Sequence, residues 1–129
     1  MDCLFCKIIK GEIPSETIYE DDLVKVFLDI NPTTNGDSLI VPKKHFTDFR
    51  DIDNETLIRI NDVAKKLLPL YQEKLKCDGL TLSNNALYSQ EIKHFHMHFI
   101  PRYIDDGVKH LSNKECLKDI KIIKDKLKQ

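Results

Sequence analysis

Long hydrophobic runs are missing from this 129-residue chain, and no stretch approaches the roughly 20 apolar residues that a membrane-spanning helix needs. The first residues, Met1-Asp2-Cys3, form neither a basic nor an apolar leader. An excess of charge of one sign is missing too, because 20 basic side chains are balanced by 21 acidic ones. This balance provides no electrostatic footprint for duplex nucleic acid or for an anionic membrane. We therefore expect a soluble, cytoplasmic protein.

Cysteine is also scarce, and four cysteines are too few for a disulfide scaffold. Cys3 and Cys6 stand at C-x-x-C spacing, which in a reducing compartment more often binds metal or does redox work. Free thiols on a helix face are the alternative. Cys77 and Cys116 have no partner at a telling spacing, so packing is their expected role. Repeats, low-complexity tracts and Pro/Gly/Ser linkers are absent, and we expect residues 1–129 to form one domain.

Residue patterns predict short strands and three helices. Asp2 as N-cap and Gly11 beyond the end bracket a short helix over 3–10. Apolar residues at helical spacing predict a long helix over 53–76, with a kink or an early break at Pro69. Runs of β-forming residues predict strands over 17–20, 24–28, 38–41, 80–83 and 93–100, the last ended by Pro101.

The end of the chain has the spacing of a capping box at Ser112-Asn113-Lys114-Glu115. Behind it, one apolar stripe predicts a terminal amphipathic helix through Leu117, Ile120, Ile123 and Leu127. Together these elements predict an α+β fold, in which an antiparallel sheet of about five strands is combined with one long helix and two short terminal helices.

The segment His94-Phe95-His96-Met97-His98-Phe99 carries the most chemistry. A strand turns successive side chains to opposite faces, so the three imidazoles share one face and the apolar residues point into a core. Three interpretations remain open from spacing alone. The histidines could line a polar exposed face, they could ligate a metal such as zinc, or one could be a nucleophile that attacks phosphorus.

The residues around this segment resemble the histidine triad (HIT) family of nucleotide hydrolases and transferases, in its bacterial Hit and Hint-like branch. The signature H-x-H-x-H with hydrophobic spacers is followed here by Pro101 and Arg102 and preceded by Gln90. The likeness runs nearly from end to end, through Cys3-Leu-Phe-Cys6-Lys-Ile-Ile-Lys-Gly-Glu-Ile-Pro14-Ser, Tyr19-Glu-Asp-Asp22, Phe27-Leu-Asp29-Ile-Asn-Pro32 and Val41-Pro-Lys-Lys-His45. So many ordered blocks make the resemblance specific.

The resemblance implies a role for each matching residue. His96 would attack the α-phosphorus and form a nucleotidyl-histidine, His98 would contact the phosphate, and His94 would support the nucleophile. Gln90 would reach the phosphate or the leaving-group oxygen, and Asp29 would accept hydrogen bonds from the ribose hydroxyls. The apolar slot for the base would be formed by Phe5, Ile8, Phe27 and Ile30, although each could equally be a core residue.

The same resemblance gives the cysteines a meaning. Cys3, Cys6, His45 and His94 would supply two thiolates and two imidazoles, which is a ligand set for a structural tetrahedral zinc. A closed structural site has no open position and would not activate water.

The sequence departs from the family pattern at two places. Ser83 occupies the position of the family's active-site asparagine, and Asn84 replaces it only if the loop register shifts by one. Asp37 stands where many members have histidine, and no function follows from it.

The resemblance implies an enzyme that cleaves nucleoside 5′-phosphoramidates or related AMP- or GMP-type nucleotidyl compounds, dinucleoside polyphosphates being a second substrate class. It also implies a homodimer. The alternative is a zinc-stabilised nucleotide-binding or protein-interaction module with little turnover, in which the loop from Ser83 to Ser89 has lost catalytic geometry.

Overall fold

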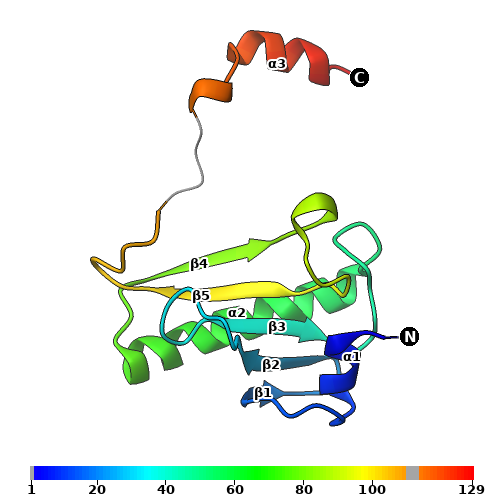
Figure 1. The fold of residues 1–129 in the computed structure, drawn as a ribbon, viewed down its shortest axis with the longest axis vertical. Coiled ribbons are helices and arrows are strands. Elements are labelled where there is room, and N and C mark those ends of the chain that lie inside the picture. The colour runs from blue at the N-terminus through cyan, green and yellow to red at the C-terminus, as the bar shows by residue number, and fades with distance from the viewer. Residues whose placement is uncertain (1, 110–113) are drawn as a thin grey trace.

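The computed structural model describes residues 2–109 and 114–129, and its centre is a five-stranded antiparallel sheet. The strands lie in the order β1-β2-β3-β5-β4 (Figure 1). Their bounds are Thr17–Glu20 for β1, Val24–Leu28 for β2, Ser38–Pro42 for β3, Gly79–Asn84 for β4 and Met97–Arg102 for β5. The helices are α1 (Leu4–Ile9), α2 (Asn54–Leu75) and α3 (Ile120–Leu127), with 3₁₀ turns at Leu87–Ser89 and Lys114–Cys116. The predicted α+β fold is confirmed.

The two faces of the sheet carry separate apolar clusters. Val24 and Val26 of β2 pack in the larger cluster with α2, which lies behind the sheet in Figure 1. Phe27, the next residue, packs in the smaller cluster with Phe5 and Ile8 of α1. This alternation follows from the two-residue period of a strand. The candidate site lies on the sheet face that carries the smaller cluster. On this face α1 covers only part of the strands, so the rest of the face is left open (Figure 1).

The short first helix begins one residue later than predicted. Its N-cap is Cys3 and not Asp2, because the Cys3 Sγ atom accepts a hydrogen bond from the Cys6 backbone N–H at 3.4 Å. A thiolate or thiol at this position occupies the place of the usual oxygen acceptor. The chain leaves the helix at Gly11, whose φ of 82° is in the left-handed region.

The long helix passes through Pro69 without the early break that was one of the two predicted outcomes. Proline removes one backbone donor from the helix ladder. Pro69 is exposed, so the carbonyl that loses its partner can bond to water. Asp53 caps the start by accepting a hydrogen bond from the Thr56 N–H at 2.8 Å.

The strand that carries the third histidine differs most from prediction, because it runs from Met97 to Arg102 and not over 93–100. His94 and Phe95 are held by other contacts, among them the Phe95 N–H donating to the Phe46 carbonyl at 2.7 Å. Pro101 lies inside the strand and does not end it. The β3 neighbour stops at the Ser38–Phe99 pair, so the missing N–H of Pro101 interrupts no ladder on that side.

The predicted terminal helix exists but starts at Ile120, capped by Asp119, so Leu117 precedes it. Ser112 and Asn113 of the predicted capping box lie outside the described residues. The apolar residues of α3 are exposed, Ile120 to 82% and Leu127 to 73%. Among the described residues, no helix combines the length and apolar composition that a membrane span requires.

Candidate functional site

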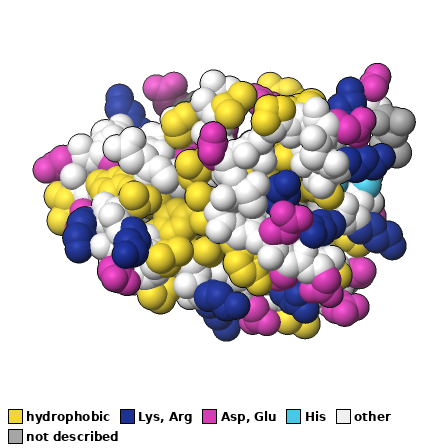
Figure 2. All heavy atoms as spheres, turned by 90° about the horizontal axis from the view of Figure 1, so that it is seen from below, with side chains coloured by type: hydrophobic (Ala, Val, Ile, Leu, Met, Phe, Trp, Pro, Cys, Tyr) yellow, Lys and Arg dark blue, Asp and Glu magenta, His cyan; other side chains and the backbone are white. Residues whose placement is uncertain are grey.

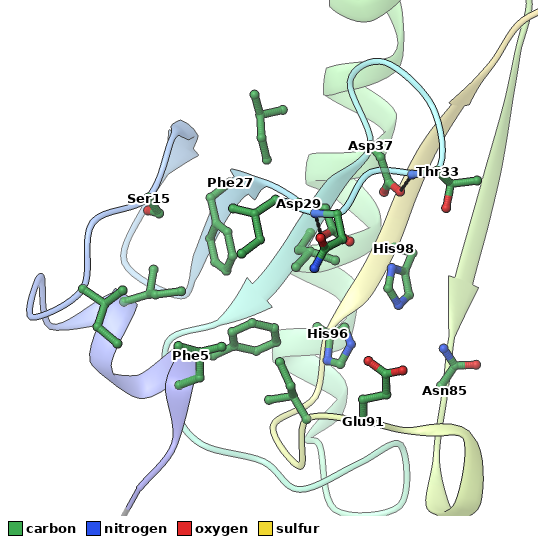
Figure 3. Close-up of a pocket in the computed structure, with 18 of the residues that line it drawn as sticks. Phe5, Ser15, Phe27, Asp29, Thr33, Asp37, Asn85, Glu91, His96 and His98 are labelled. Atoms are coloured by element: carbon green, nitrogen blue, oxygen red, sulfur yellow. Dashed lines mark hydrogen bonds between the residues drawn. The ribbon is translucent and has the colours of Figure 1, made fainter.

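A pocket of about 640 Å³ opens on the sheet face that α1 partly covers. Four of its lining residues are the predicted base-slot residues Phe5, Ile8, Phe27 and Ile30. Phe5, Ile8 and Phe27 are buried, whereas Ile30 is 90% exposed, and Figure 3 shows Phe5 and Phe27 on the side of the pocket away from His98. Phe5 packs edge-on against Phe27, with ring centroids 5.6 Å apart. The opposite side of the pocket is polar and includes His96 and His98.

His96 is 6% exposed and lines the pocket, and among the described residues only its Nδ1 has a hydrogen-bond partner. Its Nδ1 lies 2.8 Å from the His94 carbonyl oxygen. Because that oxygen can only accept, Nδ1 carries the proton and Nε2 keeps its lone pair. Burial lowers the pKa of His96, so the ring is neutral near pH 7. A neutral imidazole with a free Nε2 has the form that a nucleophile needs.

His98 lies beside His96, with ring centroids 5.0 Å apart. Asp29 and Asp37 approach the same ring, since one ligand atom from each of these three residues lies within 4.8 Å of the others. The Asp29 Oδ1 atom accepts a hydrogen bond from the Asn31 N–H at 2.9 Å, which orients its carboxylate at the pocket edge. Burial raises the pKa of Asp37.

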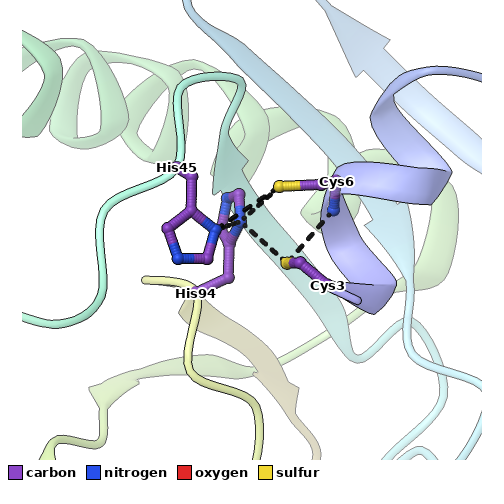
Figure 4. Close-up of side chains that lie close together, drawn as sticks. All are labelled: Cys3, Cys6, His45 and His94. Carbon is purple, nitrogen blue, oxygen red and sulfur yellow. Dashed lines mark hydrogen bonds between the residues drawn. The ribbon is translucent and has the colours of Figure 1, made fainter. Parts of the chain in front are cut away.

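His94 faces away from the pocket, into a cluster with Cys3, Cys6 and His45 (Figure 4). The His94 Nδ1 lies 3.3 Å from the Cys3 Sγ and 3.5 Å from the Cys6 Sγ. The His45 Nδ1 lies 3.1 Å from the His94 Nδ1 and 3.4 Å from the Cys6 Sγ. The prediction that all three imidazoles share one face is therefore wrong. His96 and His98 line the pocket, whereas His94 points into the cluster, because the chain is not in a strand before Met97.

The chemistry of this cluster fits a tetrahedral metal ion. Ligand bonds of about 2.3 Å to sulfur and 2.0–2.1 Å to nitrogen give ligand-to-ligand distances of roughly 3.3–3.8 Å, close to those observed. The His94 Nε2–H donates to the Pro42 carbonyl at 2.8 Å, so its Nδ1 offers a lone pair to the cluster. Burial lowers the pKa of His94 to about 4, which keeps the ring neutral as a ligand must be.

Three other predicted site residues lie outside the pocket lining. Asn84 uses its side-chain amide to donate to the His96 carbonyl at 2.9 Å, and thereby fixes the backbone of the nucleophile candidate. Ser83 pairs with His98 in the sheet register. Gln90 is buried, and its Nε2 donates to the Thr47 carbonyl at 2.7 Å.

Asn85, Glu91 and Asp37 line the pocket, although sequence reasoning gave none of them a site role. Figure 3 shows Asn85 and Glu91 beside His96 and His98. Asp37 could have been found from its departure from the family's histidine, while Glu91 carried no signal beyond its position after Gln90. Among the described residues, no Lys or Arg lines this pocket.

The wider surface shows no charge footprint on the face seen in Figure 2, where basic and acidic side chains are mixed around an apolar area. This agrees with the balanced composition.

The sequence model of the HIT domain family matches residues 10–105 of this chain. This chain belongs to the HIT domain family. The HIT chain is 43% identical to an uncharacterized HIT-like protein of Methanocaldococcus jannaschii over 128 residues, covering 92% of this chain and 98% of that protein. It is 41% identical over 100 residues to adenosine 5′-monophosphoramidase HNT1 of Saccharomyces cerevisiae, covering 78% of this chain and 62% of that protein.

A solved structure of a zinc-bound histidine triad family protein from Mycobacterium smegmatis superposes on this HIT fold with a TM-score of 0.80. The two sequences are 32% identical, and the match covers 89% of this chain and 87% of that one. The resemblance first drawn from the sequence blocks is thus confirmed at the level of the family and the fold.

Proposed function

We propose that this HIT protein hydrolyses nucleoside 5′-phosphoramidates or related nucleotidyl compounds through a covalent intermediate on His96. The observation that carries this proposal is the arrangement of His96, which lines the pocket and whose Nδ1–H is fixed by the His94 carbonyl, so that its Nε2 keeps its lone pair. The monophosphoramidase activity in the name of the yeast relative supports the choice of substrate class.

The chemical step follows from this tautomer. The Nε2 lone pair of His96 forms a bond to the α-phosphorus while the bond to the leaving nitrogen breaks, and that nitrogen takes up a proton from solvent, which regains one when water attacks the intermediate. Water then cleaves the N–P bond, which releases the nucleoside monophosphate and restores His96. His98 lies next to His96 and is proposed to contact the phosphate oxygens as charge develops on them.

The nucleotide itself would lie along the pocket. The ribose hydroxyls would donate to Asp29, and the base would lie in the apolar slot of Phe5, Ile8, Phe27 and Ile30. Asn84 holds the His96 backbone, so we propose that it positions the nucleophile and does not bind the substrate. Gln90 anchors the loop at Thr47 and supports the same segment.

We further propose that Cys3, Cys6, His45 and His94 hold a structural zinc. The converging ligand atoms support this, as does the zinc-bound HIT structure from Mycobacterium smegmatis. A closed zinc site supplies folding energy and no catalytic water. His94 would fix the backbone on which His96 sits, because the two residues are bonded through the His94 carbonyl.

Two organisational proposals complete this account. Residues 1–129 form one HIT domain, and two chains form a homodimer. The β4 strand lies at the edge of the sheet, so its outer backbone groups are available for pairing. Native mass measurement at low micromolar concentration tests the dimer, and a mass of one chain would contradict it.

The alternative is a binding module with little turnover, and it is distinguished by the covalent step. Purified protein is mixed with adenosine 5′-phosphoramidate, AMP release is measured, and intact mass is used to look for an AMP adduct. Release and a transient adduct, both lost in His96→Ala, support the hydrolase. Binding of AMP without either supports the module.

A further inference from the structure

A second group of ligating side chains lies in the pocket itself. Asp29, Asp37 and His98 come from three different segments, and one ligand atom of each lies within 4.8 Å of the other two (Figure 3). We propose that these three residues bind a divalent cation of the Mn²⁺ or Mg²⁺ class. The cation's proposed role beside the phosphate rests on the proposed function, whereas its binding does not.

Asp37 provides the first argument, because its carboxylate is buried with one oxygen unpartnered. The residue is 2% exposed, and its Oδ2 accepts a hydrogen bond from the Thr33 N–H at 2.8 Å. Its Oδ1 is buried and has no hydrogen-bond partner among the described residues. A buried carboxylate oxygen without a hydrogen-bond partner is costly. A cation bound between Asp37, Asp29 and His98 supplies the missing partner.

The charge of the pocket provides the second argument. Asp29, Asp37 and Glu91 line it, and no described Lys or Arg side chain does. A phosphate placed there would meet three carboxyl groups with only imidazoles to offset them. Proteins commonly bind phosphate through cationic side chains or through a metal ion. A divalent cation beside His98 offsets the negative charge of the nearby carboxyl groups and makes this end of the pocket favourable for phosphate.

The donor set indicates which cation. Two carboxylates and one imidazole are hard or intermediate ligands, which suit Mn²⁺ and, less well, Mg²⁺. The cluster of Cys3, Cys6, His45 and His94 offers two cysteine sulfurs and therefore selects a softer ion such as zinc. Asp29 donates no proton and has about four lone-pair sites, of which the Asn31 N–H uses one. It can therefore contact a cation and a ribose hydroxyl at once.

The test uses the 129-residue protein loaded with one zinc per chain, so that the cluster of Cys3, Cys6, His45 and His94 is filled. Mn²⁺ is added, and free Mn²⁺ is followed by electron paramagnetic resonance. We expect one Mn²⁺ per chain to bind, and Asp37→Asn to weaken this binding at least about tenfold, since even the loss of a residue that only supports a ligand costs that much. Asp62→Asn, an exposed aspartate of α2, is the matched control and should bind Mn²⁺ as the wild type does.

Asparagine at position 37 keeps an oxygen for the Thr33 N–H, so this variant is expected to fold. His98→Asn removes a different ligand and should lose Mn²⁺ to a similar extent. Wild-type protein that binds no Mn²⁺, or an Asp37→Asn variant that binds it unchanged, would overturn the proposal. AMP release without Mn²⁺ binding would support the proposed hydrolase and reject the cation site. Mn²⁺ binding without AMP release would support the cation site and reject the proposed hydrolase.

Discussion

At the scale of single residues, His94 and His96 have different surroundings: His94 belongs to the cysteine–histidine cluster and His96 lines the pocket. The two side chains are two positions apart, yet His94 turns toward the cysteines and His96 toward the pocket. The contact that joins them is the His96 Nδ1–H bond to the His94 carbonyl. A change at the metal cluster is therefore expected to reach the nucleophile through the backbone.

The cluster gives a prediction about zinc. Purified protein should contain about one zinc per chain, and Cys3→Ser should lose the metal and lower the melting temperature, because structural zinc couples to folding. His94→Ala should do the same. His96→Ala should keep both the zinc and the melting temperature, since His96 is not among the four grouped side chains. Elemental analysis and thermal melts measure both quantities. Zinc-free wild-type protein, purified without chelator, would contradict this.

Asp48 gives a prediction about acid stability. Its hydrogen bonds and ion pair with Arg50 lower the pKa of Asp48 to about 2 from 3.8. A carboxyl with a depressed folded-state pKa contributes stability that is present above its unfolded pKa and is lost as the pH falls. Denaturant unfolding should therefore show the Asp48 contribution at pH 6 and lose it between about pH 4 and pH 2.

Asp48→Asn is the comparison for this measurement. The variant should be less stable than the wild type at pH 6, and the difference should shrink as the pH falls through that interval. A difference that stays constant from pH 6 to pH 2 would mean that the charge of Asp48 is not the cause.

At the scale of elements, the predictions succeeded where local pattern decides and failed where distant contacts decide. Strands over 17–20 and 24–28 were placed correctly because their β-forming residues are bounded by polar turns. The strand expected over 93–100 was shifted, because the Phe46 and Pro42 carbonyls hold Phe95 and His94. No local pattern reports bonds to residues about fifty positions away.

The turn before β3 gives the prediction at this scale. Gly36 has a φ of 92°, and an added Cβ would lie 2.5 Å from the Leu75 Cδ1 and 3.2 Å from the Pro101 Cγ. Gly36→Ala should lower the free energy of unfolding by about 2–3 kcal/mol, through backbone strain and overpacking together. Denaturant unfolding measures this change.

Gly11→Ala is the matched control, because Gly11 has a φ of 82° but nothing within 4 Å of an added Cβ. It should show only the strain, which is about 1 kcal/mol. If both variants lost the same free energy of unfolding, the overlap of the added Cβ at position 36 with Leu75 would contribute nothing.

At the scale of the whole molecule, the sequence was sufficient for the family, the α+β architecture and the cysteine–histidine cluster. Those features rest on ordered blocks such as Cys3 to Pro14 and Val41 to His45. The polar half of the pocket was harder to predict from the sequence. Asp37 and Glu91 both line it because the chain brings the loop before β3 and the loop before the triad to the same pocket, and neither this proximity nor the burial of Asp37 can be read from local sequence.

The central claim is that His96 forms a covalent bond to the α-phosphorus. The measurement that tests it most directly is the intact mass of the protein during turnover of adenosine 5′-phosphoramidate, with AMP release followed in parallel. We predict a transient increase by one adenylyl group in the wild type, and neither adduct nor AMP release in His96→Ala. An adduct of the same mass in His96→Ala, or steady AMP release by that variant, would contradict the account.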